Sequence, residues 1–586
     1  MFSTITPSVA EFTFLGVRSV VVIAVAFIAA ALASPAGRTA RAGNPVLDEN
    51  KQQGTTQWDR IYLSGVYIEG YASSQSVTPG DQLAFHVSTK PAARYRIEFY
   101  RLGWYASDGA RLVACLPGCT AEEQGAAQPV PAPDPTTGEV RADWPVTDTI
   151  VVPPDWTTGY YLAEIVVTSG RFTGQGKRIP FIVRPVPSST PSQVLVVAPV
   201  NTWEAYNDWG GNSLYVGTTG HPAFKVSFDR PGVSDLSGLQ WEYPLVRFLE
   251  REGYDVSYTT DVDVDRDPAE LLRHRLVVVP GHSEYWSHGM RAAFDRAKAA
   301  GTNLFFAGAN DGYWQIRYGD DSRTIVGYKE LASRDPSPDP QLKTTRFRDL
   351  TTPDPECELT GVAYQPGSWG IPSQDYPVNP FALSDPWFGG TNFTATTTLH
   401  GLMGGEWDGA TPGCVKVPET ILFAFDGSSV GKPPADAVRY VASSGAEVFA
   451  TGSHQFSWGL DSDPYTPPGL ADPGLQQFMR NALADLTRPA APFHIRVARS
   501  ATAFRLSVTR NADPRVKDVV VYEHAGRALF DPDGSGAGAA LVCKTRQTTC
   551  TVSAPGGGSY RFAAVAVDAW GRSRPTFSGV VAPEKP

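Results

Sequence analysis

The sequence predicts a multidomain protein in which β-sandwiches flank a doubly wound α/β domain. At 586 residues the chain is too long for one hydrophobic core. Short alternating apolar runs between turn signals occupy both ends of the chain, whereas strand and helix patterns alternate in the middle. The 56 Gly and 49 Pro favour short strands and many turns over long helices.

Composition limits the partners that the protein can have. Apolar residues make up 42% of the chain, which excludes a mostly disordered protein. A net charge of −10 implies no basic face, so nucleic-acid binding is not expected. The expected partner is a small-molecule substrate, and the sequence leaves the oligomeric state open.

Residues 1–42 predict export. Arg18 precedes the apolar run Val20–Ala33, which ends in Ala31-Leu32-Ala33, the order of a secretory signal peptide. The run is shorter than the ~20 residues that a membrane-spanning helix needs. Because the segment before Arg18 is long, an uncleaved anchor and association with the cell envelope stay open. A secreted or cell-surface protein is predicted.

The six Cys residues predict disulfides. An even number of Cys in an exported chain is typical of disulfide bonding, and no CxxC pair indicates a zinc site. Sequence alone leaves the connectivity open, but spacing favours three local pairs: Cys115 with Cys119, Cys357 with Cys414, and Cys543 with Cys550.

Residues 43–187 predict an immunoglobulin-like β-sandwich, because strand-like runs at 82–87, 95–100, 160–167 and 179–183 alternate with turns. Residues 188–488 predict the α/β domain, of amidotransferase- or flavodoxin-like type. Its expected strands are 193–199, 254–258, 276–279, 303–307 and 447–452, and its expected helices are 239–253, 267–272, 290–300 and 474–484. Residues 344–401 form an irregular insertion or lid in this prediction.

Residues 489–586 predict a second β-sandwich, with strand-like runs at 504–508, 519–522 and 560–568. The segment from Tyr560 to Ser573, which contains Asp568-Ala569-Trp570-Gly571, resembles the last strands of a fibronectin type III module.

Three polar and aromatic loops follow predicted strands of the α/β domain, at 201–211, 282–287 and 308–317. Parallel strands bind ligands outside their carboxyl ends, so these loops are expected to meet at one sheet edge. In the third loop, Asn310 occupies the place where hydrolases carry a nucleophile, and no Cys lies in such a turn. Catalysis without a protein nucleophile points to metal-activated water.

The ligands available for a metal are oxygen donors. No HExxH or paired-His spacing occurs among the nine His, which argues against zinc. Tyr206 and Glu284 suit a hard ion such as Fe(III) better than Zn(II). The acidic run 261–267 lacks the Gly and the terminal Glu of a calcium loop and is expected to be a solvated surface.

Several spaced motifs together resemble the large (β) subunit of the N,N-dimethylformamidase family. They are NTWEAYNDWGG from 201, GHSEYWS from 281, FAGANDGYWQIR from 306 and GSHQFSWG from 452. The resemblance covers about 193–485 and also takes in FYRLGWY from 99 and DGARL from 108, whereas the C-terminal β unit lies outside it.

The resemblance implies a mononuclear non-haem iron (Fe3+) held by two tyrosines and one glutamate. Glu284 matches the glutamate and Tyr206 one tyrosine, while the second tyrosine is expected in the sandwich strand, at Tyr161 rather than Tyr160. His282, Asn310 and Glu406 are the implied catalytic residues, and Lys329 is a further candidate. The expected pocket residues are Trp203, Tyr285, Trp286 and Phe456, whereas His454 is expected to be structural.

The implied activity is hydrolysis of a small amide or related C–N bond. His282 or Glu406 would carry the proton to the leaving amine, and Asn310 would orient the substrate. Two features depart from the family: nothing here resembles its small partner subunit, and export with an added β module is unlike a cytoplasmic amidase. The main alternative is an inactive cell-surface protein that binds carbohydrate through an aromatic groove. A weaker one is an amidotransferase-like fold that hydrolyses esters or glycans.

Overall fold

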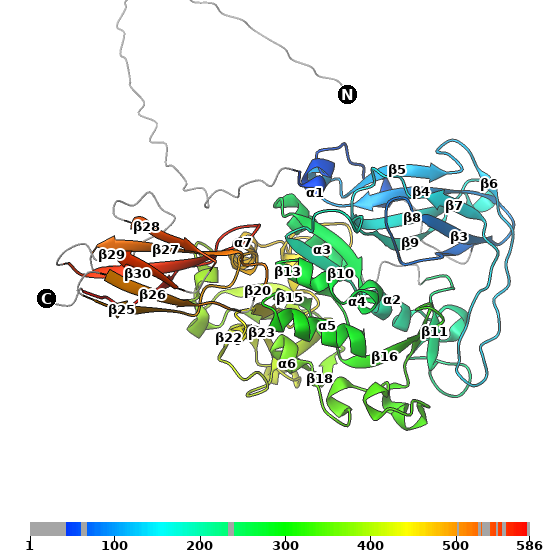
Figure 1. Ribbon diagram of the computed structural model, residues 1–586. Coiled ribbons are helices and arrows are strands. Elements are labelled where there is room, and N and C mark those ends of the chain that lie inside the picture. The colour runs from blue at the N-terminus through cyan, green and yellow to red at the C-terminus, as the bar shows by residue number, and fades with distance from the viewer. Residues whose placement is uncertain are drawn as a thin grey trace, which may run out of the picture. The chain divides into compact units, whose positions relative to one another are not determined.

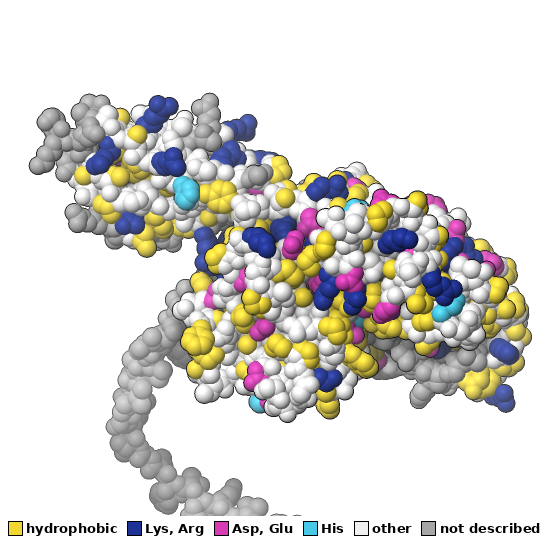
Figure 2. Space-filling model, turned by 90° about the horizontal axis from the view of Figure 1, so that it is seen from below, with side chains coloured by type: hydrophobic (Ala, Val, Ile, Leu, Met, Phe, Trp, Pro, Cys, Tyr) yellow, Lys and Arg dark blue, Asp and Glu magenta, His cyan; other side chains and the backbone are white. Residues whose placement is uncertain are grey.

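The computed structural model describes residues 43–59, 67–232, 239–500, 503–511, 513–525, 529, 539–546, 549–553 and 558–582. The predicted signal peptide lies outside these ranges. Within them, no helix combines the length and apolar character needed to cross a membrane. The described chain is rich in β-structure, with many sheets and few helices (Figure 1). On the face drawn in Figure 2, basic and acidic side chains are interspersed with apolar ones.

Residues 68–183 form two sheets around one apolar core. The first sheet contains β1 (Ile68–Ala72), β3 (Gln82–Thr89) and β7 (Asp148–Val151). The second contains β2 (Ser76–Val77), β9 (Gly176–Val183), β8 (Gly159–Val167), β4 (Arg94–Leu102) and β5 (Ala110–Leu116), with β6 (Glu123–Gln124) paired to β4. Period-two alternation turns Phe85, Phe99 and Ile165 into the shared core, as expected for a sandwich.

A seven-stranded mixed sheet forms the centre of the chain. Its order is β12 (Val256–Thr260), β10 (Val194–Ala198), β13 (Leu276–Gly281), β15 (Asn303–Gly308), β24 (Glu447–Ala450), β23 (Ala435–Val441) and β22 (Glu419–Phe425). The first five strands are parallel, and β23 runs antiparallel to both of its neighbours, β24 and β22. Alternate residues of β10 enter two different apolar clusters, so both faces of the sheet are covered.

Helices contribute to both of these clusters. One cluster includes residues of α3 (Leu239–Arg251) and α7 (Pro473–Leu486), and the other includes residues of α5 (His288–Ala299). The remaining helices are short: α1 (Pro45–Glu49), α2 (Val200–Tyr206), α4 (Asp261–Arg266) and α6 (Cys357–Thr360). The predicted doubly wound domain is not supported as such, because β23 runs antiparallel to its neighbours and the long connection from β15 to β22 carries small sheets in place of crossover helices.

The sandwich and the central domain are joined by a buried ion pair. The Arg101 guanidinium of β4 binds the Glu250 carboxylate of α3 at 2.9 Å, and neither side chain is exposed. The Tyr258 hydroxyl donates to the same carboxylate at 2.8 Å. A buried charge pair is costly to break, so these contacts hold the two parts together.

The loops after two neighbouring central strands continue into a second sheet. It contains β11 (Lys225–Ser227), β17 (Thr324–Val326), β16 (Trp314–Gly319) and β14 (Tyr285–Ser287). The parallel strands β14 and β16 follow β13 and β15 closely in the chain. The polar loops at the sheet edge are therefore tied down at both ends.

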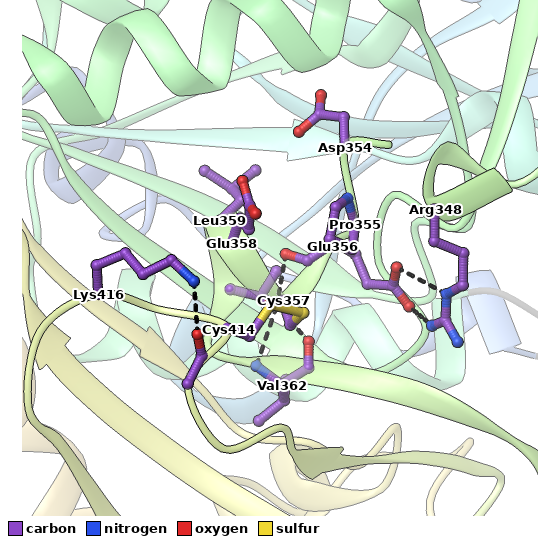
Figure 3. Close-up of a disulfide and its surroundings, with 12 residues drawn as sticks. Arg348, Asp354, Pro355, Glu356, Cys357, Glu358, Leu359, Val362, Cys414 and Lys416 are labelled. Carbon is purple, nitrogen blue, oxygen red and sulfur yellow. Dashed lines mark hydrogen bonds and ion pairs between the residues drawn. A yellow bond between two sulfur atoms is a disulfide. The ribbon is translucent and has the colours of Figure 1, made fainter. Parts of the chain in front are cut away.

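The predicted insertion forms two hairpin-like pairs. β18 (Val362–Trp369) pairs with β21 (Glu406–Ala410), and β19 (Gln374–Pro377) pairs with β20 (Thr398–Met403). The Cys357–Cys414 disulfide closes this segment, and Figure 3 shows it beside Glu356, whose carboxylate forms an ion pair with Arg348. All three predicted disulfides, Cys115–Cys119, Cys357–Cys414 and Cys543–Cys550, are present. Such bonds are typical of extracellular proteins.

Loss of the Cys357–Cys414 bond is expected to destabilise the central domain strongly. The bond closes a loop with a sequence separation of 57 residues, for which chain entropy predicts a loss of about 4 kcal/mol in the free energy of unfolding. Urea unfolding of a Cys357→Ala/Cys414→Ala variant measures it. The matched control is Cys115→Ala/Cys119→Ala, whose separation of 4 residues predicts a smaller loss of about 2 kcal/mol. Equal losses in both variants would contradict the entropic explanation.

The C-terminal part forms two sheets around a small core of its own. One contains β25 (His494–Arg499), β26 (Ala503–Thr509) and β29 (Thr549–Ser553), and the other β28 (Ala539–Thr545), β27 (Asp518–Ala525), β30 (Tyr560–Val567) and β31 (Thr576–Phe577). The core includes Phe504 and Phe562. Arg275 of the central domain forms buried ion pairs with Asp513 and Asp568 of this part.

Candidate active site

The three predicted loops meet at the carboxyl edge of the parallel strands. Tyr206 ends the helix that follows β10, Glu284 lies between β13 and β14, and Asn310 follows β15. Backbone contacts join the loops: the Glu284 amide donates to the Thr202 hydroxyl at 2.9 Å, and the Asn201 side chain donates to the Tyr285 carbonyl at 3.0 Å. Adjacent parallel strands end at the same edge, which explains the convergence.

Tyr206, Tyr215 and Glu284 form a cluster of oxygen atoms. The Tyr206 hydroxyl donates to Glu284 Oε2 at 2.9 Å, and the Tyr215 hydroxyl lies 3.0 and 2.8 Å from the two Glu284 oxygens. The two hydroxyls are 2.9 Å apart, and their rings stack with centroids separated by 4.4 Å. The cluster thus contains two tyrosines and one glutamate.

The structure does not bring Tyr161, the predicted second metal ligand, to this cluster. Its hydroxyl donates to the Thr157 carbonyl at 2.7 Å, and its ring stacks on Trp156 inside the sandwich core. Tyr160 points to the opposite side of β8 and donates to Glu242 at 2.7 Å. Tyr215 lies beside Tyr206 and Glu284 instead. The local signal was its position nine residues after Tyr206, in the chain that leaves the same loop.

Glu406, Asn310 and two histidines surround the other side of Glu284. His282 Nε2 lies 3.6 Å from Glu284 Oε2 and 3.6 Å from Glu406 Oε2. The Asn310 amide donates to Glu406 Oε2 at 2.7 Å. The Glu406 N–H donates to His454 Nδ1 at 3.2 Å, while His454 Nε2 lies 3.1 Å from the Ala309 carbonyl. Both ring nitrogens of His454 are therefore engaged, consistent with the expected structural role.

Asn310 and Lys329 have backbone conformations that are costly for residues other than glycine. Their φ angles are 54° and 56°. The Asn310 N–H donates to the Asp408 carboxylate, whose oxygens lie 3.0 and 2.9 Å away, and this bond offsets the cost of the backbone conformation. Lys329 Nζ donates to the Tyr285 hydroxyl at 3.0 Å and lies 3.3 Å from the centre of the Tyr215 ring. Both residues are thereby aimed at the cluster.

Burial dominates the electrostatics of the site. It raises the pKa of Glu284, and burial together with the Glu284 charge raises the pKa of Glu406 to about 8. Burial likewise lowers the pKa of Lys329 to about 8, and burial followed by the proximity of His454 lowers the pKa of His282. The two carboxyl groups, each 3.6 Å from His282 Nε2, repel each other's charge, so a cation between them would favour their joint ionisation.

Burial also shifts the pKa values of the two tyrosines in the cluster. Burial of the hydroxyl ends, and then the Glu284 charge, raises the pKa of Tyr206 and of Tyr215. The residues are nevertheless 39% and 38% exposed, because their rings are partly open at the site while the hydroxyls point inward. In the absence of a cation, these phenols keep their protons.

The oxygen cluster fits a hard cation. Two phenols and a carboxylate converge within hydrogen-bond distance, and a multivalent cation there would favour their deprotonated forms. His282, Glu406 and His454 also place ligand atoms within 4.8 Å of one another. That second group fits less well, because both His454 nitrogens already have partners.

Two of the four predicted pocket aromatics lie elsewhere. A main cavity of ≈380 Å³ opens beside Tyr206, His282 and Glu406, and Trp203 lines it. The Tyr285 hydroxyl donates to Tyr215 at 2.7 Å. Trp286 points to the other side of β14 and packs on Phe294, since neighbouring strand residues face opposite ways. Phe456 is buried in the core against Phe423 and Phe449. Neither Trp286 nor Phe456 is a pocket residue.

Comparisons with known proteins define the class. The sequence matches the model of the family described as "N,N-dimethylformamidase beta subunit-like, C-terminal" over residues 96–469, more than half of the chain. The chain belongs to this family, as its motifs predicted, and the family suggests an amide hydrolase of metal-dependent type. No curated protein matches the chain.

Solved structures add little. Titin kinase with its flanking domains is 23% identical and has a TM-score of 0.14; the match covers 17% of this chain and only 17% of that structure. The chicken CNTN1 FN1–FN3 domains are 10% identical, with a TM-score of 0.14, over 88% of this chain and 98% of that one. At these scores the likenesses carry no argument about fold or function.

Proposed function

We propose that the protein is an exported, iron-dependent hydrolase of an amide or related C–N bond. The observation that carries this proposal is the convergence of Tyr206, Tyr215 and Glu284 beside Glu406, His282 and Asn310. Family membership supports the reaction class. The three disulfides and the signal-peptide pattern of residues 18–33 support export.

Tyr206, Tyr215 and Glu284 would hold ferric iron. Bound iron supplies a Lewis acid and makes a nearby water more acidic. Glu406 faces the main cavity and has a raised pKa, which suits it to exchange a proton with water or with the leaving nitrogen. Asn310 orients Glu406 through its amide and is near enough to bind a substrate carbonyl.

His282 and Lys329 have supporting roles in this proposal. Burial keeps His282 neutral, so its ring can hydrogen-bond to either carboxyl group and orient it. Lys329 balances negative charge near Glu284 and positions Tyr215 and Tyr285. We also propose the domain boundaries 43–187, 188–488 and 489–586, with an immunoglobulin-like first module and a fibronectin type III-like last module.

Metal analysis of the purified full-length protein tests the proposal. We expect about one iron per chain and a tyrosinate-to-iron absorption band, because phenolates bind ferric iron well. The band should weaken or disappear in Tyr206→Phe and Tyr215→Phe. Tyr161→Phe is the matched control and should retain both band and metal, since its hydroxyl bonds to Thr157. A folded protein that binds no iron would overturn the proposal.

The alternative is an inactive binding protein that presents an aromatic groove to carbohydrate. It draws support from Trp369, which lines the main cavity and is 59% exposed. Tryptophan faces are common contact surfaces for ligands at wet sites. A metal-free protein that binds glycans and hydrolyses no amide would favour this function.

A further inference from the structure

A large cavity opens beside the candidate active site. Its volume is ≈380 Å³, and Tyr206, His282 and Glu406 lie in its lining. The remaining walls come from three parts of the chain: the sandwich strands β1 and β9, the central domain around α2 and α3, and Trp369 with Gly370 at the end of β18. Trp369 pairs directly with Glu406 across the β18–β21 ladder, so the insertion carries both a wall residue and a candidate catalytic residue.

The walls of this cavity are apolar. They include Ile179 and Pro180 of the sandwich and the indole rings of Trp203, Trp241 and Trp369. Two arginines also line it, but each is already paired: Arg178 with Glu164 at 2.8 Å, and Arg230 with Glu204 at 2.6 Å. Because both arginines are already paired, the part of the cavity away from Glu406 and His282 is suited to an uncharged, apolar group.

The end nearest the site has polar atoms that lack partners. His282 Nε2 and Trp241 Nε1 are buried and have no hydrogen-bond partner among the described residues. Both residues line the cavity, with their ring centres 6.2 Å apart. Buried polar groups are normally satisfied, so a polar group of a bound molecule is expected at this end.

The volume sets the size of that molecule. The cavity holds the space of about a dozen waters at ~30 Å³ each. It falls within the range of roughly 300–1,000 Å³ typical of pockets for drug-sized ligands. An amide with only methyl substituents would leave most of the apolar wall uncovered.

We propose that the substrate is an amide bearing a bulky apolar group, such as an aromatic ring or a long alkyl chain, which occupies the tryptophan-lined cavity while the amide lies at His282 and Glu406. This inference rests on the proposed hydrolase function. In the reaction the C–N bond breaks, the water oxygen bonds to the carbonyl carbon, and a water proton passes to the nitrogen, which gives a carboxylic acid and an amine.

Matched amides test the substrate class on the full-length, iron-loaded protein. We expect kcat/KM for N-benzylformamide to exceed that for N-methylformamide by about tenfold or more, because burial of the ring adds hydrophobic free energy. Trp369→Ala should reduce this preference by about fivefold, because it removes an indole wall of the cavity. Phe381→Ala is the control, since Phe381 is 94% exposed and does not line the cavity.

A binding measurement keeps the inference separate from the proposed function. Titration of the iron-free protein, followed by tryptophan fluorescence, should show tighter binding of N-benzylformamide than of N-methylformamide, and weaker binding in Trp369→Ala. Hydrolysis of the small amide with no preference for the large one would overturn the inference and leave the hydrolase function intact. Selective binding of the large amide without any hydrolysis would overturn the function and support the cavity assignment. Equal binding of both amides would overturn the cavity assignment.

Discussion

Replacement of Glu284 by Gln is expected to remove the iron and to reduce kcat/KM by on the order of a hundredfold or more. Glu284 bonds to both Tyr206 and Tyr215, so its charge is the centre of the oxygen cluster. Loss of an outer partner of a metal ligand already costs about 10–100-fold in affinity or activity, and a direct ligand should cost at least as much. Metal content per chain and steady-state kinetics with an amide substrate measure the two effects.

The control for this substitution is Glu242→Gln. Burial raises the pKa of Glu242 to about 8, so the group is largely neutral at pH 7 and the amide changes little charge. Glu242 bonds to Tyr160 and Trp203 and not to the oxygen cluster. The control should therefore keep its iron. A Glu284→Gln protein with the full metal content would rule out the proposed ligand set.

Replacement of Glu406 by Gln is expected to leave the iron in place and to lower kcat by about 10²–10⁴-fold, the usual contribution of a general acid or base. Glu406 lies 3.6 Å from His282 and accepts from Asn310 at 2.7 Å, but neither Tyr206 nor Tyr215 is hydrogen-bonded to it. The substitution thus removes a proton carrier without removing a proposed ligand. Single-turnover kinetics on the iron-loaded variant separates the chemical step from substrate binding.

A partly buried carboxyl in a different sheet is the control for Glu406. Burial also raises the pKa of Glu419, which lies in β22. Glu419→Gln should keep kcat within about twofold, as surface-like substitutions usually do. If Glu406→Gln loses iron together with activity, Glu406 belongs to the ligand set and not to the proton-transfer step.

Much of the candidate site could be predicted from short motifs. Glu284, Tyr206 and Asn310 each follow a run of buried apolar residues within a few positions, and parallel neighbours end at the same edge. Two of the disulfides could also be predicted from close spacing in the sequence, because Cys115–Cys119 and Cys543–Cys550 have separations of only 4 and 7 residues. Local patterns carry this information because strand direction and chain length limit where such residues can go.

Side-chain direction was harder to predict. Tyr160 and Tyr161 are adjacent, as are Tyr285 and Trp286, and a register change of one residue exchanges the faces of a strand. The structure turns Tyr161 into the sandwich core and Trp286 into the layer beside α5. Phe456 was assigned to the pocket by its motif, but it packs among aromatic rings of the core.

By itself, the sequence determined the family and singled out Tyr206, His282, Glu284 and Asn310, because each lies in a contiguous motif, whereas for the cysteines it only favoured local pairs. Only the tertiary structure decided that Tyr215 joins the cluster in place of Tyr161, and that Trp369 and the sandwich strands complete the cavity. Those contacts join residues far apart in the chain or depend on the rotation of a strand, and both are settled by packing of the whole core rather than by local pattern.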